Sequence, residues 1–258
     1  MSRVSQVRAS FVRSMRIFLR DKAIVGSSIL VPVFFLVVLP LVIFQNVPVE
    51  FMPALRGFLA IAMVTLLIMT VAMSNLPGSI AADRDHDLYS KLSSMPVNPL
   101  YECLGRIVTV FVFSAIGSLA IIMIGLALGA ELIITSLDLP LVVGAASGIV
   151  LFSAGLGLII ASVVKSESAA AHIGVAIVLV NYFIGIAFPY GDLPDLLKPM
   201  VHVNPVCIGN NMIAVRTVGE EFVGYNPFNF MDITVMLVLT ILLFTIGLYI
   251  YSRYCWRR

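Results

Sequence analysis

The chain has 258 residues, of which 60% are hydrophobic and 12% charged, and its mean hydropathy is +1.06. A soluble domain carries about 25% charged residues, so this composition excludes an ordinary water-soluble protein. The formal net charge is only +2. The charges nevertheless gather between long apolar runs, which indicates an all-α integral membrane protein.

Residues 3–22 predict a cationic amphipathic helix. Its apolar positions recur at three- and four-residue steps: Val4, Val7, Phe11, Met15 and Phe18. The arginines between them are Arg8, Arg13, Arg16 and Arg20. Such a helix lies among lipid headgroups, with its arginines near anionic lipid. Simple anchoring by positive charge is the alternative.

Six apolar runs follow, each of roughly 18 residues or more, which is enough to cross a bilayer core as a helix. We expect spans at 23–44, 57–74, 107–129, 140–164, 169–187 and 232–251. Pro32 and Pro40 predict a kink or an unwound turn in the first span. Six spans place both ends of the chain on one side of the membrane.

Basic residues predict which side that is. Of the 16 Lys and Arg residues, only Arg56, Lys198 and Arg216 fall between spans on the side away from the termini. Because basic residues favour the cytoplasmic side, we expect both termini in the cytoplasm and localisation to the cell membrane. The segment between spans two and three then also faces the cytoplasm.

That segment contains DRDHD (83–87). Asp83, Asp85 and Asp87 imitate the first ligands of a calcium-binding EF-hand loop, but that loop needs glycine at position 6 and glutamate at position 12. Leu88 and Ser94 stand there instead, so calcium binding of that kind is excluded. A looser carboxylate–histidine ion site stays open as an alternative.

A helix over 83–96 explains the segment better. Acidic residues at its start suit the helix dipole, and Asp87 and Lys91 are spaced for an ion pair. Leu88, Leu92 and Met95 share one side, and Pro96 ends the helix. A solvated connector gains little from this apolar stripe, so we expect a short helix that docks onto a partner.

Residues 188–231 are long for a connection between spans five and six and contain helix signals. Asp192 can cap a helix that opens near Pro194. Asn204 followed by Pro205 predicts the start of a second helix, and Gly219 marks its end. We expect two short helices that lie against the membrane or re-enter it.

Two glycine motifs, GLALG (125–129) and GAASG (144–148), lie in spans three and four. Small residues at this spacing let helices approach closely in lipid. The contact is made either within one chain or between two copies.

No catalytic constellation is visible. The sequence has no GxxxxGK[ST] phosphate loop, so the chain does not bind ATP in that manner. Its three histidines and three cysteines lie in separate regions, which argues against a metal site and against disulfides. We expect no enzyme activity, no metal, no cofactor and no nucleic-acid partner for this chain itself.

The sequence resembles the membrane subunits of type-2 ABC exporters over nearly its whole length. The family's inner-loop pattern reads acidic-Arg-acidic-x-Gly-Thr-Leu-Glu-x-Leu-x-x-x-Pro. Its matches here are Asp83, Arg84, Asp85, Leu92 and Pro96, and its departures are Asp87, Leu88 and Ser90. A second pattern follows span five, with matches at Phe188-Pro189, Leu193-Pro194, Asn204-Pro205 and Arg216.

The resemblance implies a permease subunit. Residues 83–96, including Lys91, would form the coupling helix that docks on a separate ATP-binding subunit, and residues 3–22 the interfacial helix. Two copies of that subunit would supply ATP and Mg, and a second copy of this chain or a similar permease would complete the membrane part. Substrate would pass between spans one, two and five, past Thr65, Thr70, Asn181, Tyr182 and Phe183.

The substrate is expected to be a hydrophobic or amphipathic molecule such as a drug or lipid, with a polysaccharide or lipid-linked glycan as the alternative. A secondary transporter or channel without an ATPase is the alternative of another class. Such a protein uses ionisable residues within its spans, and the middle of each predicted span holds no Asp, Glu, Lys or Arg. A non-transporting membrane scaffold is a third interpretation.

Overall fold

A computed structural model describes residues 3–42 and 48–256, apart from the side chain of Ala23. The described residues form helices and turns and include no strand. The helices are α1 (Arg3–Arg20), α2 (Lys22–Val25), α3 (Val31–Val42), α4 (Met52–Thr70), α5 (Leu76–Asp85), α6 (Leu88–Ser93), α7 (Pro99–Ala127), α8 (Leu139–Val163), α9 (Glu167–Gly185), α10 (Lys198–Val203), α11 (Pro205–Thr217), α12 (Glu220–Val223) and α13 (Phe230–Tyr254). Two π-helical turns, Gly26–Leu30 and Val71–Asn75, and two 3-10 turns, Val49–Phe51 and Tyr190–Asp192, complete the described helical segments.

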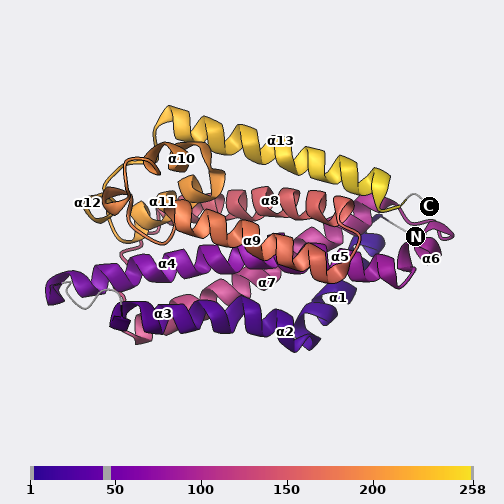
Figure 1. Cartoon of the computed structure of the whole chain (residues 1–258), viewed down its shortest axis with the longest axis horizontal. Helices are drawn as coiled ribbons and strands as arrows, with labels where there is room; N and C mark the ends of the chain where they lie inside the picture. Colours follow the sequence, from indigo (N-terminus) through magenta and orange to yellow (C-terminus); the bar gives the residue numbers. More distant parts are fainter. Residues whose placement is uncertain (1–2, 43–47, 257–258) are drawn as a thin grey trace.

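Five helices are long and apolar enough to cross a membrane: Val49–Asp85, Pro99–Ala127, Leu139–Val163, Glu167–Gly185 and Phe230–Tyr254. They run side by side along the long axis of the molecule (Figure 1). The first predicted span, 23–44, corresponds to a shorter apolar helix, Gly26–Val42, and its last two residues lie outside the described residues. The prediction of an all-helical, multi-pass membrane protein is confirmed, and the count of six spans stays a prediction.

The first helix, α1, and the last turn of the final helix, α13, lie on the same side of the bundle. We call the side that holds α1, α6 and the last turn of α13 the terminal end, and the side that holds α10, α11 and α12 the opposite end (Figure 1). This arrangement agrees with the predicted placement of both termini on one side of the membrane.

The second span is longer than predicted and forms the centre of the bundle. The sequence predicts a span at 57–74 and a separate helix at 83–96, but one continuous helix runs from Val49 to Asp85. The most apolar 18-residue stretch of this helix is completely buried by the rest of the chain. The small residues near its polar end, such as Gly78 and Ala81, allow the helix to continue between its neighbours.

Prolines explain the two π-helical turns. Proline has no N–H, and its ring clashes with the carbonyl four residues earlier in an α-helix. Each π turn ends two residues before such a proline, Pro32 or Pro77. The wider turn is closed by bonds over five residues, from Val31 N to Gly26 O and from Leu76 N to Val71 O. The irregularity predicted for the first span is therefore present, and a second one interrupts the central helix.

Two glycines allow neighbouring helices to touch the second π turn. A Cβ atom at Gly157 of α8 would lie 2.1 Å from the carbonyl oxygen of Ala72, and one at Gly174 of α9 would lie 1.9 Å from that of Met73. No side chain fits at such distances. The central helix is therefore in close backbone contact with α8 and α9 at its π turn.

Helix α7 begins at Pro99 rather than near residue 107 as predicted. Its N-cap is Asn98, whose side-chain oxygen accepts a hydrogen bond from Leu100 N, and Pro99 occupies the first helical position. Both features favour a helix start. The two charged residues of the first turns, Glu102 and Arg106, pair with each other, so they do not interrupt the helix.

The segment before the last span packs into the opposite end of the bundle. Helix α11 is almost entirely buried and lies against α4, α8 and α13. Its predicted cap is confirmed, because Asn204 Oδ1 accepts a hydrogen bond from Val206 N at 3.0 Å. The preceding short helix begins at Lys198 and not near Pro194, because residues 190–192 first close a 3-10 turn.

Candidate functional site

The segment predicted to dock a partner is built differently from the expected single helix over 83–96. Asp83 and Asp85 lie in the last turn of α5 and not at the start of a helix. Asp87 has a left-handed backbone with φ of 55°, and α6 begins after it at Leu88. The helix also ends at Ser93, before Pro96. Acidic residues at a helix C-terminus are unfavourable to its dipole, so Asp83 needs a cationic partner there.

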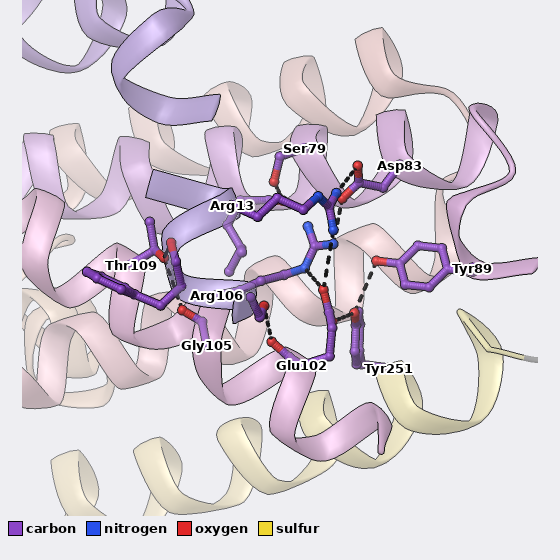
Figure 2. A network of polar contacts seen from close by, with 12 residues as sticks. Arg13, Ser79, Asp83, Tyr89, Glu102, Gly105, Arg106, Thr109 and Tyr251 are labelled. Atoms are coloured by element: carbon purple, nitrogen blue, oxygen red, sulfur yellow. Dashed lines mark hydrogen bonds and ion pairs between the residues drawn. The ribbon is translucent and has the colours of Figure 1, made fainter. Parts of the chain in front are cut away.

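Two arginines supply that charge. The Asp83 carboxylate accepts a hydrogen bond from Arg106 at 2.5 Å on one oxygen and pairs with Arg13 on the other. Arg106 also donates through Nε to Glu102 Oε1 at 2.6 Å. The Arg106 side chain is 1% exposed and that of Glu102 is 4% exposed. A buried charge is tolerated only when it is paired, and here two acids and two arginines satisfy one another (Figure 2).

Two tyrosines close the cluster from the other side. The hydroxyl of Tyr251 on α13 donates to Glu102 Oε2, and it lies 3.0 Å from the hydroxyl of Tyr89 on α6. Burial raises the pKa of the Tyr89 phenol well above its usual range, so this hydroxyl stays protonated. The cluster therefore joins α1, α5, α6, α7 and α13 (Figure 2). We refer to Arg13, Asp83, Tyr89, Glu102, Arg106 and Tyr251 as the ion cluster.

Helix α1 is fixed against α7 along its length. Ser10 Oγ donates to the carbonyl of Glu102 at 2.7 Å, and Thr109 Oγ1 donates to the carbonyl of Phe11 at 3.3 Å. Nearer the chain start, Gln6 Oε1 accepts from Asn98 N at 3.0 Å. Of the four arginines predicted to face lipid headgroups, Arg13 turns into the ion cluster, while the others are exposed: Arg8, Arg16 and Arg20.

Arg84 points in a different direction from Asp83 and caps α8. Its guanidinium donates to the carbonyls of Ala161 at 3.1 Å and Lys165 at 3.0 Å, and also to that of Val164. A cation at a helix C-terminus satisfies carbonyls that have no helical partner. Arg84 therefore ties the end of the central helix to the connection between α8 and α9.

The remaining charged residues of the segment point away from the bundle. Asp85, His86, Asp87 and Lys91 are exposed, and Met95 is 55% exposed. Within the described part of the chain, the expected ion pair between Asp87 and Lys91 is absent. Leu88 and Leu92 are half-buried beneath this surface. We call Asp85, Asp87, Lys91 and Met95 the docking face.

The predicted pathway residues do not share one surface. Thr65 is buried and donates to Asn210 Oδ1 at 2.8 Å, while Thr70 bonds back to the carbonyl of Leu66. Their own chain thus encloses both side chains. Asn181 accepts from Asn204 Nδ2 at 2.6 Å. Tyr182 is buried and Phe183 is 60% exposed.

The predicted residues of the opposite end are also dispersed. Pro189 and Pro205 are buried, whereas Pro194 is exposed. Asn204 joins α11 to α9 through Asn181. Arg216 pairs with Asp138 at 3.4 Å and lies 4.4 Å from the ring centroid of Phe228. Hydrogen bonding from Thr135, assisted by Arg216, lowers the pKa of Asp138, so this carboxyl is ionised.

Sequence reasoning missed the partners on α7 and α13. Glu102 and Arg106 stand four residues apart just before an apolar run, which is the spacing of a helical ion pair. That signal was readable, but only once the helix start at Pro99 was known. Tyr251 has no comparable signal, because a tyrosine near the end of a span is also typical of a membrane interface.

The described residues contain no group of three His, Cys, Asp or Glu side chains that could hold a metal ion. The docking face is exposed, whereas the ion cluster is largely buried and internally paired.

The comparison with protein families agrees with this geometry. The model of the ABC-2 type transporter family matches residues 5–215, which include the ion cluster except Tyr251 and most of α1 and α11. The chain belongs to the ABC-2 type transporter family. A search of curated proteins found no match. Membership confirms the resemblance to type-2 ABC permeases and makes the chain a membrane permease subunit, distinct from the ATP-binding subunit that partners it.

Proposed function

We propose that this ABC-2 permease couples ATP hydrolysis by its partner subunit to the export of a hydrophobic or amphipathic molecule. The terminal end is then cytoplasmic, in the cell membrane, and the docking face contacts the ATP-binding subunit. Two copies of that subunit, with ATP and Mg, work with two permease chains, either identical or similar. A polysaccharide or lipid-linked glycan is the alternative substrate.

The proposal rests on a difference within residues 83–96, where some charged side chains are bound to their own chain and others are exposed. Asp83 and Arg84 are bound to their own chain, while Asp85, Asp87 and Lys91 are exposed. Exposed charges on a short helix can recognise a partner surface. The buried neighbours hold that helix in place, so a force on the docking face reaches the membrane helices.

The contacts indicate where such a force would go. Asp83 passes a displacement of α5 to α7 and α1 through Arg106 and Arg13, and Arg84 passes it to α8 and α9. ATP binding that draws two docking faces together would favour one arrangement of these helices over another. The chain performs no chemistry in this scheme and supplies the element whose populations shift.

Charge reversal on the docking face tests the coupling. We expect Asp85→Lys combined with Asp87→Lys to abolish the stimulation of ATP hydrolysis in the assembled complex, because two attractive contacts become repulsive. The variant should still insert, since neither side chain is bound within the described chain. Its thermal stability should fall only slightly, because the left-handed backbone of Asp87 suits aspartate better than lysine. Glu221→Lys, an exposed acid at the opposite end, is the matched control and should keep normal stimulation.

Normal stimulation in the Asp85→Lys, Asp87→Lys variant would overturn the proposed docking face. Co-purification adds a direct readout, because the ATP-binding subunit should be lost from the double variant and retained by Glu221→Lys. Retention of the subunit together with normal ATP hydrolysis in both variants would favour a transporter that is not coupled through this surface.

Cysteine labelling tests the orientation. The native cysteines Cys103, Cys207 and Cys255 are all buried, so an impermeant thiol reagent should report an added cysteine alone. We expect Glu221→Cys to be labelled in intact cells and Asp87→Cys only after lysis. The reverse result would contradict the proposed cytoplasmic placement of the terminal end.

A further inference from the structure

An apolar groove lies between α8 and α13, away from the ion cluster and the docking face. Its volume is 430 Å³, and its lining residues come from α8, α11 and α13 and from the connection before α13. This volume is within the range of small-molecule sites, roughly 300 to 1,000 Å³. The groove begins near Pro140 and Phe228 at the opposite end and continues to Leu151 and Ile241. Both α8 and α13 are long enough to span a membrane, and the groove opens to the outside of the chain, where Leu237 and Ile241 of its lining are exposed.

A glycine keeps the groove open. A Cβ atom at Gly144 would meet no other atom within 4 Å, so the space beside it is not filled by any described side chain. Four residues on, Gly148 is different, because a Cβ there would lie 2.4 Å from Met236 Cε. The GAASG motif thus has one glycine that allows packing within the chain and one that leaves room for a ligand.

A cation lies beside one residue of the groove lining. Phe228 is part of the lining, and the guanidinium of Arg216 lies 4.4 Å from its ring centroid. Arg216 makes an ion pair with Asp138 at 3.4 Å, and its side chain is 39% exposed. Asp138 also accepts hydrogen bonds from Thr135. The arginine therefore keeps donors for a second anion, while its acid is already bound.

We propose that this groove is a binding site for one phospholipid molecule, with an acyl chain between α8 and α13 and the phosphate hydrogen-bonded to Arg216. Arginine is suited to phosphate because its planar fork donates two parallel bonds. The chain-facing wall is apolar, as an acyl chain requires. A bound lipid would accept hydrogen bonds from the guanidinium. It would also fill space that otherwise lowers the packing density between α8 and α13.

The groove favours a lipid over a helix of another protein chain. The small residues Gly144 and Gly148 in the lining would also suit a helix interface in lipid, but the partly exposed guanidinium of Arg216 complements a headgroup. The exposed lining residues Leu141 and Leu237 are compatible with an acyl chain. This site is separate from the proposed contact of Arg8, Arg16 and Arg20 with headgroups, which lies at the terminal end.

Photolabelling of the full chain in lipid vesicles tests the site. The probe is a phosphatidylglycerol with a photoactivatable group in its acyl chain, and labelled peptides are identified by mass spectrometry. We expect labelling of 140–151 and 228–241 in the unaltered chain. Gly144→Phe should lower it at least fivefold by filling the groove. Val143→Phe is the matched control, because Val143 is 55% exposed and does not line the groove, and should change labelling by less than twofold.

The headgroup contact has its own test. Arg216→Gln should reduce labelling by the phospholipid probe at least threefold and leave labelling by a diacylglycerol probe, which lacks phosphate, unchanged. Equal labelling of the unaltered chain and Gly144→Phe would overturn the site, as would equal effects of Arg216→Gln on both probes. Efficient disulfide formation between Leu237→Cys residues of two chains would also overturn it, since a second copy would then fill the groove.

If Gly144→Phe fails to fold, Gly144→Leu fills the same space with a smaller side chain. Competition in the unaltered chain gives a further measurement, in which unlabelled phosphatidylglycerol should displace the probe better than diacylglycerol. Equal competition by the two lipids would contradict the proposed role of Arg216.

Discussion

The two halves of the molecule hold their buried polar groups in different ways. At the terminal end, Asp83 and Glu102 face Arg13 and Arg106 in an ion cluster. In the other half one buried acid, Asp232, contacts His202, and most other buried polar contacts are neutral, such as the hydrogen bond from Thr65 to Asn210. The same central helix takes part in both. Breaking a buried charged contact singly costs more than breaking a neutral one, so the terminal end should be the less tolerant half.

The largest effect is expected at Arg106. Arg106→Met leaves Glu102 buried without its main partner, and breaking a buried ion pair costs about 3 to 5 kcal/mol. The melting temperature of the detergent-solubilised chain should fall accordingly. The double variant Glu102→Gln, Arg106→Met should be more stable than Arg106→Met alone, because the pair of Arg13 and Asp83 remains. Additive losses in the double variant would contradict the coupling within the ion cluster.

A smaller effect is expected at Tyr251. Tyr251→Phe removes the hydroxyl that donates to Glu102 Oε2 and contacts Tyr89. Hydrogen bonds to charged groups contribute about 1.5 to 3 kcal/mol, so the free energy of unfolding from chemical denaturation should fall by that amount and the midpoint should fall with it. Tyr249→Phe, an exposed tyrosine two residues earlier, should leave the midpoint unchanged. Equal shifts in both variants would show that Tyr251 acts only through packing.

In the other half, Thr65→Val should cost less than Tyr251→Phe. The substitution keeps the shape of the side chain but leaves Asn210 Oδ1 without its donor, for which we expect a loss at the lower end of about 1 to 3 kcal/mol. Thermal unfolding measures it. A loss as large as that of Arg106→Met would abolish the distinction drawn between the two halves.

The smallest effect is expected at the exposed pair of Lys198 and Asp195, whose nitrogen and oxygen are 2.8 Å apart. The Asp195 side chain is 95% exposed, so water and salt screen the interaction. Lys198→Gln should not change the melting temperature measurably, at either low or high ionic strength. A clear loss at low salt alone would indicate a stronger electrostatic contribution at the opposite end than the geometry implies.

How far the sequence could predict this molecule depended on the range of the interaction. The long apolar runs and the cap at Asn204 are local features, and the structure confirms them. The predicted extent of the central helix was wrong, because Asp83 was assigned to the start of a new helix without regard to its distant partners. Asp83 pairs with Arg106 on another span, which is 23 residues away in the sequence. No local pattern links these two residues.

The pathway residues show a second limit. Thr65 and Phe183 were grouped because both lie in predicted spans, but the first is enclosed by its own chain and the second is 60% exposed. Which face of a helix points inward depends on the packing of all helices together. The roles of these residues in transport stay predictions.

The π turn at Val71–Asn75 fixes the rotational phase of the central helix. An α-helix turns by about 100° per residue, so one residue accommodated in a wide turn changes the direction of every side chain beyond it. The direction in which Asp83 points toward Arg106, relative to that of Thr65 toward Asn210, depends on this extra residue. The relative direction of these two contacts therefore depends on the number of residues between them as much as on the identity of the residues that make them.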